Sequence, residues 1–476
     1  MNSYEVRIAE ITIKNFKNVM YGSISLANGK KDYRSSILGL YGQNGSGKTA
    51  LIDALELLKY ALRGVQIPSK FADYINIDNE EAELEFTFEL KEKDNIIQVS
   101  YKFSLRLYRD DSLQNSEAAN SSIQEKKVVI VKEILKCPII SDKTIKIGRL
   151  LDSSETILTP EKKKNLLVGK DKSTDIELIV DKKLTYRESR SFLFSKELLM
   201  RIRNQVNGNL VSTPEKSEQV FYLSILESLV NYGNNCLFVI NTQTSGVISL
   251  NAQPINFKFR EEKIRAIGSI MLPLDRSILV PEEALSVIIK VFSGMNIVLE
   301  KIIPGLSISI KELGFETLPN GDKGCRIELM SQKNSKEIPL RNESEGIRKI
   351  VSILQLLIVV YNQSSITVAI DELDSGVFEY LLGEILKIIA EKGRGQLIFT
   401  SHNLRPLETL DKSFIAFTTT NSKNRYFRMH NVKGTNNLRD FYYRDIIIGD
   451  QKEELYEHTN NSEIALAFRE AGSKNG

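Results

Sequence analysis

The sequence predicts an α/β fold in which a mixed β-sheet with flanking helices is interrupted by a mainly helical insertion. An apolar run at 36–41 leads into a glycine-rich loop and then into an amphipathic helical pattern. Two later apolar runs, at 366–370 and 396–400, each end in polar residues. The runs 83–90 and 96–107 alternate with a period of two, which indicates an antiparallel hairpin and a sheet that is not purely βαβ.

The first predicted unit, residues 1–109, is the N-terminal half of this fold. Apolar and polar residues alternate over 8–15, and a second short strand is expected at 23–26. The helix after the glycine-rich loop is expected to start near Lys48. Its apolar positions are Leu51, Ile52, Ala54, Leu55 and Leu58.

The glycine-rich loop, GQNGSGKT at 42–49, matches the phosphate-loop pattern G-x-x-x-x-G-K-[ST]. Its glycines let successive backbone N–H groups turn toward one anion, and the following helix adds the positive end of its dipole. Lys48 is expected to reach the β- and γ-phosphates of a nucleoside triphosphate, and the hydroxyl of Thr49 to bind Mg²⁺. The expected contact residues are Gly42, Asn44, Gly45, Ser46, Gly47, Lys48 and Thr49.

Residues 110–304 are interpreted as an insertion between two halves of one unit. The part from 110 to 188 is polar and rich in lysine, with short β-like runs at 128–131 and 176–180. From 192 to 303 the apolar periodicity is helical, and no long heptad array indicates a coiled coil. The lysine runs are more typical of a solvated surface than of a nucleic-acid groove, because few aromatic residues lie between them.

Residues that carry chemistry return in the C-terminal half of the unit, 305–420. A hairpin is expected over 306–331, around the turn sequence PNGD. The next buried-strand run ends in Asp371 and Glu372. Asp371 is expected to contact the water shell of Mg²⁺ beside Thr49, and Glu372 to polarise the water that attacks the γ-phosphoryl group.

Two further polar positions follow from the same pattern. His402, one of three histidines, ends a strand at the sheet edge expected to carry the phosphate loop, so it can contact the γ-phosphate or the attacking water. Ser344 is placed to cap the helix that follows it, and a capped helix N-terminus is also a ready anion site. His430 and His458 lie in polar surroundings and are interpreted as bystanders.

Composition sets further limits on function. The chain has 476 residues, 42% of them hydrophobic, and a formal net charge of +3. This nearly balanced charge gives no indication of DNA binding, so any DNA contact needs a local patch. Three widely spaced cysteines are typical of a reducing compartment. Because no apolar leader or bilayer-length run is visible, we expect a soluble cytoplasmic protein without membrane contact.

The last predicted unit, residues 421–476, is a C-terminal extension. It contains the basic, aromatic stretch Arg425-Tyr426-Phe427-Arg428. This stretch is interpreted either as a late surface strand or as part of a contact with a partner or nucleic acid.

The order of these motifs resembles the ABC-type ATPase heads of the SMC, RecF and OLD group within the AAA-family ATPases. The segment ITIKNFK at 11–17 is similar to the first strand of those heads. The resemblance implies a P-loop ATPase that binds ATP with Mg²⁺ and forms a homo-oligomer through paired heads. It implies that Ser344 and Gly346 bind the γ-phosphate held by the opposite subunit. It also implies that Asp374 acts across the same interface and that His402 is the switch histidine.

The resemblance covers residues 1–107 and 305–420. The sequence departs from the family pattern in one motif, and one residue of the pattern is not assigned. The usual Leu-Ser-Gly-Gly signature becomes Glu343-Ser344-Glu345-Gly346, which brings an acid near a phosphate. The glutamine of the Q-loop stays open among Gln98, Gln114 and Gln124.

Three stretches, 371–383, 400–408 and 437–443, resemble bacterial ATPases of anti-phage defence, closest in kind to those of the PARIS system, with OLD-type and retron-linked ATPases as cousins. This resemblance implies a sensor and scaffold subunit of an abortive-infection, toxin–antitoxin-like system. Such a subunit holds a separate nuclease effector until a phage-encoded trigger protein is detected. The alternative is a DNA-repair ATPase of RecF or SMC type that clamps DNA directly.

Overall fold

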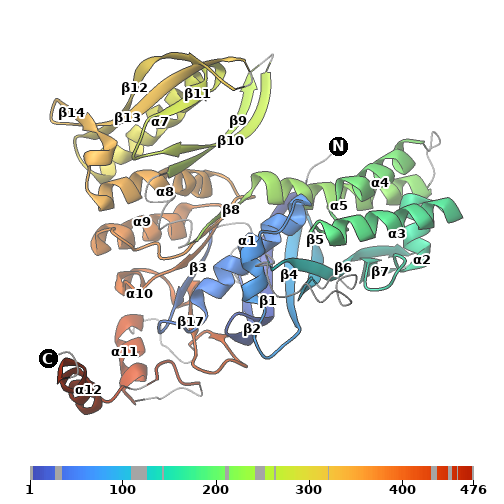
Figure 1. Cartoon of the computed structure of the whole chain (residues 1–476), viewed down its shortest axis with the longest axis horizontal. Coiled ribbons are helices and arrows are strands. Elements are labelled where there is room, and N and C mark those ends of the chain that lie inside the picture. The colour runs from blue at the N-terminus through green and yellow to red at the C-terminus, as the bar shows by residue number, and fades with distance from the viewer. Residues whose placement is uncertain are drawn as a thin grey trace, which may run out of the picture.

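The structure, a computed structural model, covers most of the chain (Figure 1). It describes residues 4–26, 35–108, 126–141, 144–208, 214–241, 252–261, 264–319, 321–429, 437–448, 453–457 and 459–473. His430, His458, Gln114 and Gln124 lie outside these residues, so the predictions made for them are not addressed by the structure.

The sheet that carries the phosphate loop, here called the core sheet, has the strand order β18-β17-β3-β16-β15-β8. All neighbouring strands in it are parallel except β17 and β18, which form an antiparallel pair at one edge. A buried parallel sheet needs apolar residues on both faces, and β3 is buried at every position. The strands are β3 (Ser36–Tyr41), β8 (Leu237–Ile240), β15 (Thr367–Ile370), β16 (Gln396–Thr400), β17 (Ile415–Thr418) and β18 (Tyr426–Phe427).

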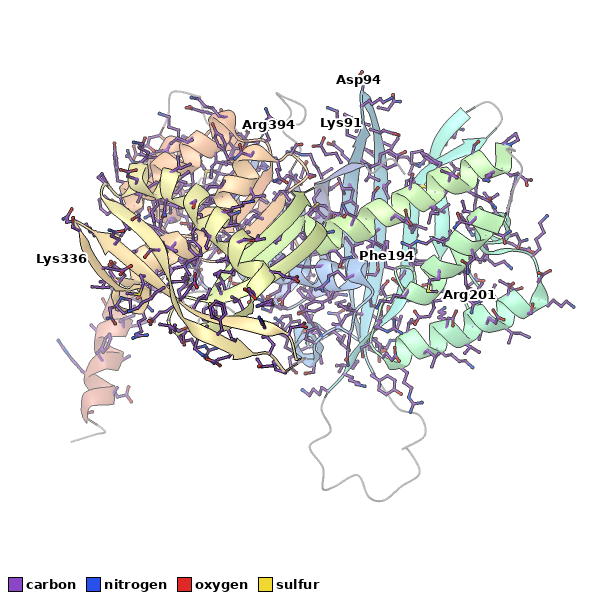
Figure 2. The ribbon with its side chains drawn as sticks, turned by 90° about the horizontal axis from the view of Figure 1, so that it is seen from above. Lys91, Asp94, Phe194, Arg201, Lys336 and Arg394 are labelled. Carbon is purple, nitrogen blue, oxygen red and sulfur yellow. The ribbon has the colours of Figure 1, made fainter. Side chains whose placement is uncertain are left out.

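A second sheet, the lateral sheet, is antiparallel throughout and has the order β2-β1-β4-β5-β6-β7. Figure 2 shows Lys91 and Asp94 at the tip of its β4–β5 hairpin. The antiparallel pairing of β4 with β5 confirms the hairpin predicted from the runs 83–90 and 96–107. The strands are β1 (Glu5–Phe16), β2 (Val19–Ser25), β4 (Glu81–Glu92), β5 (Asn95–Leu107), β6 (Val128–Ser141) and β7 (Thr144–Asp152).

Helix α1 (Lys48–Arg63) packs against both sheets and against α5. Buried residues occur on most of its circumference, as expected for a helix enclosed on several sides. Three further helices, α2, α3 and α4, join α5 over the lateral sheet (Figure 1). Their bounds are α2 (Glu161–Val168), α3 (Lys172–Arg187), α4 (Lys196–Gly208) and α5 (Pro214–Asn235).

A smaller layer of strands and one long helix, α7 (Glu282–Ile302), lies next to α8 (Glu345–Asn362) (Figure 1). The antiparallel pairing of β12 with β13 confirms the second predicted hairpin. The strands of this layer are β9 (Ala252–Glu261), β10 (Ile264–Pro273), β11 (Ile278–Pro281), β12 (Leu306–Thr317), β13 (Lys323–Lys333) and β14 (Lys336–Pro339). The remaining helices are α9 (Glu379–Lys392), α10 (Arg405–Thr409), α11 (Leu438–Ile448), α12 (Asn461–Ser473), and the 3-10 turns η1 (Ser69–Tyr74), η4 (Leu340–Asn342) and η5 (Lys412–Phe414).

The structure corrects the interpretation of residues 110–304 in two respects. The β-like run 176–180 lies in α3, where Leu178, Asp181 and Thr185 are buried at helical spacing. The part from 192 to 303 contains the expected helices but also the strands β8 to β11. Strand β8 pairs with β15 in the core sheet, so the segment interpreted as an insertion contributes a strand to the unit that it was expected to interrupt.

The two large sheets are joined by a buried side chain, Gln396 on β16. Its amide nitrogen donates to the carbonyl oxygen of Ile8, and its amide oxygen accepts from the N–H of Ile8, both at 2.8 Å. The hydroxyl of Thr367 donates to the same amide oxygen at 3.0 Å. Ile8 lies next to the bulge between Ile8 and Glu10 in the β1–β4 pairing. Gln396 therefore satisfies backbone groups of the lateral sheet from within the core sheet.

No helix in the described part of the chain is long and apolar enough to cross a membrane.

Replacing Gln396 with leucine should destabilise the fold. The substitution leaves the N–H and C=O groups of Ile8 buried without these partners, which costs about 2–4 kcal/mol of the free energy of unfolding. Urea denaturation monitored by circular dichroism measures this change. Gln98→Leu, at an exposed position of β5, is the matched control and should change the unfolding free energy by less than about 0.5 kcal/mol. Equal effects of the two substitutions would contradict the assigned role of Gln396.

Candidate nucleotide site

Three neighbouring parallel strands of the core sheet position the candidate site. Strands β3, β16 and β15 run in the same direction, so their carboxyl ends meet at one edge of the sheet. This edge opens into a pocket of about 650 Å³. The pocket is lined by Lys17, Asn18, Asn44, Gly45, Gly47, Lys48, Thr49, Ala50, Asp73, Ile75, Asn76, Ile77, Asp371, Glu372, Thr400 and His402.

The phosphate loop follows β3, and its fold depends on glycine at two positions. Gly42 has φ 152°, and a Cβ atom there would lie 1.8 Å from the hydroxyl oxygen of Thr418. Gly47 has φ 94° and lies close to Val19. The ammonium group of Lys48 folds back over the loop and donates to the carbonyl oxygens of Gly42 and Gln43, at 2.7 and 2.9 Å. These hydrogen bonds hold the cation at the mouth of the loop.

The N-terminus of α1 faces the pocket without a side-chain cap. The N-cap residue is Gly47, which has no side chain to accept from the first N–H groups of the helix. Thr49, in the first turn, lines the pocket. An uncapped helix start of this kind leaves N–H groups and the positive end of the helix dipole for an anion.

Two residues of the phosphate loop lie behind it rather than in the pocket. Gly42 and Ser46 do not line the pocket. The hydroxyl of Ser46 donates to the carbonyl oxygen of Gln43 at 2.6 Å and also contacts the hydroxyl of Thr418 on β17. In this structure both positions support the loop, whereas Asn44, Gly45, Gly47, Lys48 and Thr49 line the pocket.

The pair Asp371-Glu372 follows β15 directly. Asp371 is 1% exposed and lines the pocket, and its carboxylate accepts from the hydroxyl of Thr400 on the neighbouring strand. The N–H of Glu372 donates to the same hydroxyl oxygen at 2.8 Å. Glu372 has φ 48°, a left-handed conformation that non-glycine residues adopt at a cost of about 1 kcal/mol or more. The chain thus turns sharply between a buried carboxylate and an exposed one.

The turn after β16 brings His402 to the pocket and is held by Asp374. The backbone N–H groups of His402 and Asn403 donate to one carboxylate oxygen of Asp374, at 3.1 and 2.9 Å. Asp374 does not line the pocket. Within one chain it therefore connects the turn after Glu372 to the turn that carries His402.

The charges around the pocket are mixed. Burial lowers the pKa of the Lys48 ammonium group, and the nearby carboxylates of Asp371, Glu372 and Asp374 oppose this effect. A second buried cation, Lys349 on α8, is 1% exposed. Burial also lowers its pKa, and the same three carboxylates together with Glu345 oppose the shift. Two ammonium groups thus face the carboxylates from different helices, α1 and α8.

Ser344 and Gly346 lie at the start of α8, and neither lines the pocket of its own chain. The exposed Ser344 caps the helix, since its hydroxyl oxygen accepts from the N–H of Ile347 at 3.4 Å. At Gly346 a Cβ atom would lie 2.4 Å from the carbonyl oxygen of Gly376. Only glycine allows α8 and the turn after Asp374 to approach this closely.

One wall of the pocket, which was not predicted from the sequence, is formed by the turn between β1 and β2, by η1 and by the loop after η1. Lys17 has φ 52°, forms an ion pair with Asp53 and lies 4.0 Å from the ring centroid of Tyr74. The neighbouring side chain of Asn18 contacts the carbonyl oxygen of Gly45. Lys17 is the last residue of the segment 11–17, and its place at the end of the first strand was the only local indication that it could lie at the pocket. Its link to Asp53 in α1 is a tertiary contact that no local pattern predicts.

The C-terminal extension supports the phosphate loop from behind. The hydroxyl of Tyr426 donates to the carbonyl oxygen of Gly47 at 3.0 Å, and the guanidinium of Arg425 donates to the carbonyl oxygen of Asn18 at 2.6 Å. The strand expected at Arg425–Arg428 is present as β18. It is not fully at the surface, because Arg425 and Tyr426 are buried and Phe427 and Arg428 are partly buried.

Comparison with protein families gives a match over most of the chain. Residues 7–405 match the family described as "AAA ATPase domain". The chain belongs to this AAA ATPase family. No curated protein matches it.

Three solved structures are similar to this AAA ATPase at low sequence identity. The first is an SMC head bound to the C-winged helix domain of ScpA, at 11% identity and TM-score 0.44, covering 89% of this chain and 98% of that chain. The second is an Smc head domain from Pyrococcus yayanosii, at 10% identity and TM-score 0.41, covering 92% of this chain and 100% of that chain. The third is the recombination mediator RecF with ATP, at 13% identity and TM-score 0.35, covering 90% of this chain and 100% of that chain.

The protein is therefore an ATPase, which uses ATP together with Mg²⁺. The residues at the pocket fit both. The uncapped start of α1 and the Lys48 ammonium group are donors for phosphate oxygens, and the hydroxyl of Thr49 and the carboxylate of Asp371 are the hard oxygen ligands that Mg²⁺ prefers. Bound Mg²⁺ neutralises charge that develops on the transferred phosphoryl group.

Replacing Lys48 with alanine should weaken ATP binding by about 10- to 100-fold, because a charge-assisted hydrogen bond to phosphate is lost. Isothermal titration with the slowly hydrolysed analogue ATPγS measures the affinity. Lys14→Ala, at an exposed position of β1, is the control and should bind as the wild type does. Unchanged affinity in Lys48→Ala would remove Lys48 from the site.

Replacing Glu372 with glutamine should lower kcat for ATP hydrolysis by about 10²- to 10⁴-fold and leave ATP affinity within a few-fold of wild type. The amide has a similar shape to the carboxylate but cannot polarise the attacking water. Phosphate release under saturating ATP measures kcat. Glu379→Gln, at an exposed position a few residues further on, is the matched control. Wild-type turnover in Glu372→Gln would contradict this role.

Proposed function

We propose that two copies of this ATPase bind ATP between their heads, and that each site is completed by the signature residues of the other chain. In this proposal Lys48 and Thr49 of one chain bind the triphosphate and Mg²⁺, with Asp371. Ser344 and Gly346 of the second chain contact the γ-phosphate.

The observation that carries the proposal is the separation of two anion-binding helix starts. The uncapped start of α1 opens into the pocket, whereas the start of α8 at Ser344 is exposed outside it. Two large aromatic side chains lie exposed just after the turn that contacts Gly346, Phe378 at 71% and Tyr380 at 55%. Exposed aromatic residues beside a polar site are typical of protein–protein interfaces.

Within such a pair, Glu372 polarises the attacking water and His402 contacts the γ-phosphate or this water. The carboxylate of Asp374 accepts from the backbone N–H of His402, and Gly346 of α8 lies against Gly376, two residues after Asp374. A shift of α8 can therefore change the position of Asp374 and, with it, that of His402. Hydrolysis then removes the group that both chains contact, and the pair loses the binding energy that ATP supplied.

We further propose that the paired ATPase is a cytoplasmic sensor and scaffold of bacterial anti-phage defence. It holds a separate nuclease effector and releases it when a phage-encoded protein binds. This proposal rests on the resemblance of residues 371–383, 400–408 and 437–443 to ATPases of such systems.

Stable co-purification of the ATPase with a nuclease encoded beside it, together with weak DNA binding, is the result that this proposal predicts. Steep salt-dependent DNA binding that requires ATP would instead favour a DNA clamp, because phosphate contacts release counterions.

Mixing two inactive variants tests the shared site directly. Lys48→Ala weakens nucleotide binding in its own chain, and Ser344→Arg places a bulky cation where the second chain's γ-phosphate would lie. Each variant alone should have very low ATPase activity. An equal mixture should recover about one quarter of wild-type activity, because random pairing puts half of the chains into mixed pairs that have one intact site.

Two controls make the mixing result specific. Lys48→Ala mixed with the double variant Lys48→Ala/Ser344→Arg should recover nothing, since no pair then has an intact site. Full activity of Ser344→Arg alone, or no recovery in the mixture of the two single variants, would contradict a site shared between chains.

A further inference from the structure

The C-terminal helix α12 is amphipathic and lies apart from the rest of the molecule. It begins after Asn460, whose side-chain oxygen accepts from the N–H of Ser462 at 3.0 Å. None of its residues is buried. Ile464 and Phe468 are 42% and 77% exposed, and Leu466 is 63% exposed. Figures 1 and 2 both show α12 extending away from the body of the protein.

The side chains of α12 are arranged for binding in an apolar groove. At 100° per residue, Ile464, Ala467, Phe468 and Ala471 lie on one face. The acids Glu463 and Glu470 flank this face on one side, at about 100° from its centre. Leu466 and Arg469 each lie about 150° from the centre of the apolar face, on the far side of the helix. An amphipathic helix with large apolar side chains at i and i+4 is typical of helix-in-groove recognition.

The same chain has an apolar groove that no described element fills. It lies between α7, α8 and α9 and has a volume of about 490 Å³. Its lining is largely aliphatic and includes Ile302, Leu357 and Ile385, with Ile388 at 51% exposure. Two charged residues lie on opposite sides, Lys301 on α7 and Glu384 on α9.

We propose that α12 of one chain binds in this groove of a second copy. Ile464 and Phe468 would enter the aliphatic part, where removing their exposed surface from water is favourable. Glu463 and Glu470, which flank the apolar face of α12, can face Lys301 at the side of the groove. Helix and groove thus match in polarity, and the acids beside the helix face are opposite in sign to Lys301.

The occupant is assigned to a second copy because α12 is held close to its own phosphate loop. The N–H of Glu457 donates to the side-chain oxygen of Gln43 at 3.0 Å, and the N–H of Thr420 donates to the carbonyl oxygen of Glu454 at 2.9 Å. Four residues at about 3.5 Å each limit the start of α12 to roughly 15 Å from this tether. Figure 1 shows α10 and α11 between α12 and α9, and in Figure 2 α12 again lies away from the helices beside the core sheet.

The contact is tested by cross-linking two differently labelled chains. One full-length chain carries Glu463→Cys, beside the apolar face of α12, and the other carries Lys301→Cys, on the side of the groove. The chains are mixed without nucleotide, so that the test does not depend on pairing of the ATPase heads, and treated with a short bismaleimide. The native cysteines Cys137, Cys236 and Cys325 are buried, so wild-type protein should give little product.

We expect a cross-linked product of two chains that contains one of each variant, as read by mass spectrometry. Adding Phe468→Glu to the Glu463→Cys chain should abolish the product, because a charge would enter the aliphatic groove. Leu466→Glu is the matched control and should leave the yield unchanged, since Leu466 lies on the opposite side of α12.

Three results would overturn the proposal. These are no mixed product, a mixed product that is insensitive to Phe468→Glu, and, in a separate sample of a chain that carries both cysteines, cross-linking within that chain only. The last result would mean that α12 reaches the groove of its own chain. Because each of these substitutions lies at a position that is not buried, loss of the product can be separated from misfolding by comparing thermal unfolding of the variants.

Discussion

The nucleotide site depends on the parallel alignment of β3, β16 and β15. Because these strands run in one direction, the phosphate loop, the His402 turn and the Asp371-Glu372 pair all emerge at one edge of the core sheet. Strand β16 lies between the other two, so Thr400 at its end can bind both Asp371 and the backbone of Glu372. A single hydroxyl thereby fixes the position of the two carboxylates relative to the phosphate loop.

This edge is supported by segments that are distant in sequence. Gln396 ties the core sheet to the lateral sheet through Ile8, and Tyr426 reaches the phosphate loop across 379 residues of sequence. The hydrogen bond to Gly47 restrains the loop, and Tyr426 itself does not line the pocket. Residues beyond Tyr426 continue to Glu457, which contacts Gln43 of the same loop, and then to α12. The phosphate loop and the exposed C-terminal helix are therefore linked by a short, hydrogen-bonded path.

Local patterns in the sequence were sufficient to predict the elements that form the site. They were not sufficient to predict the elements that surround it. The run 36–41, the two hairpins and the helix after Lys48 could be predicted because their periodicity or turn residues are local. Strand β8 could not, since its four residues acquire a role only by pairing with β15, about 130 residues later. The run 176–180 has β-branched residues typical of strands, yet packing of Leu178, Asp181 and Thr185 at helical spacing decides its structure. Lys349 could have been noticed as a lysine on the apolar face of α8.

The joining of two chains by ATP is tested most directly by the mass of the Glu372→Gln variant in Mg-ATP. Light scattering during size-exclusion chromatography would compare this variant with Glu372→Gln/Ser344→Arg, each with and without Mg-ATP. We expect Mg-ATP to increase the mass of the first variant and not that of the second. Equal masses for the two variants in Mg-ATP, or a mass of Glu372→Gln that does not respond to Mg-ATP, would contradict this expectation.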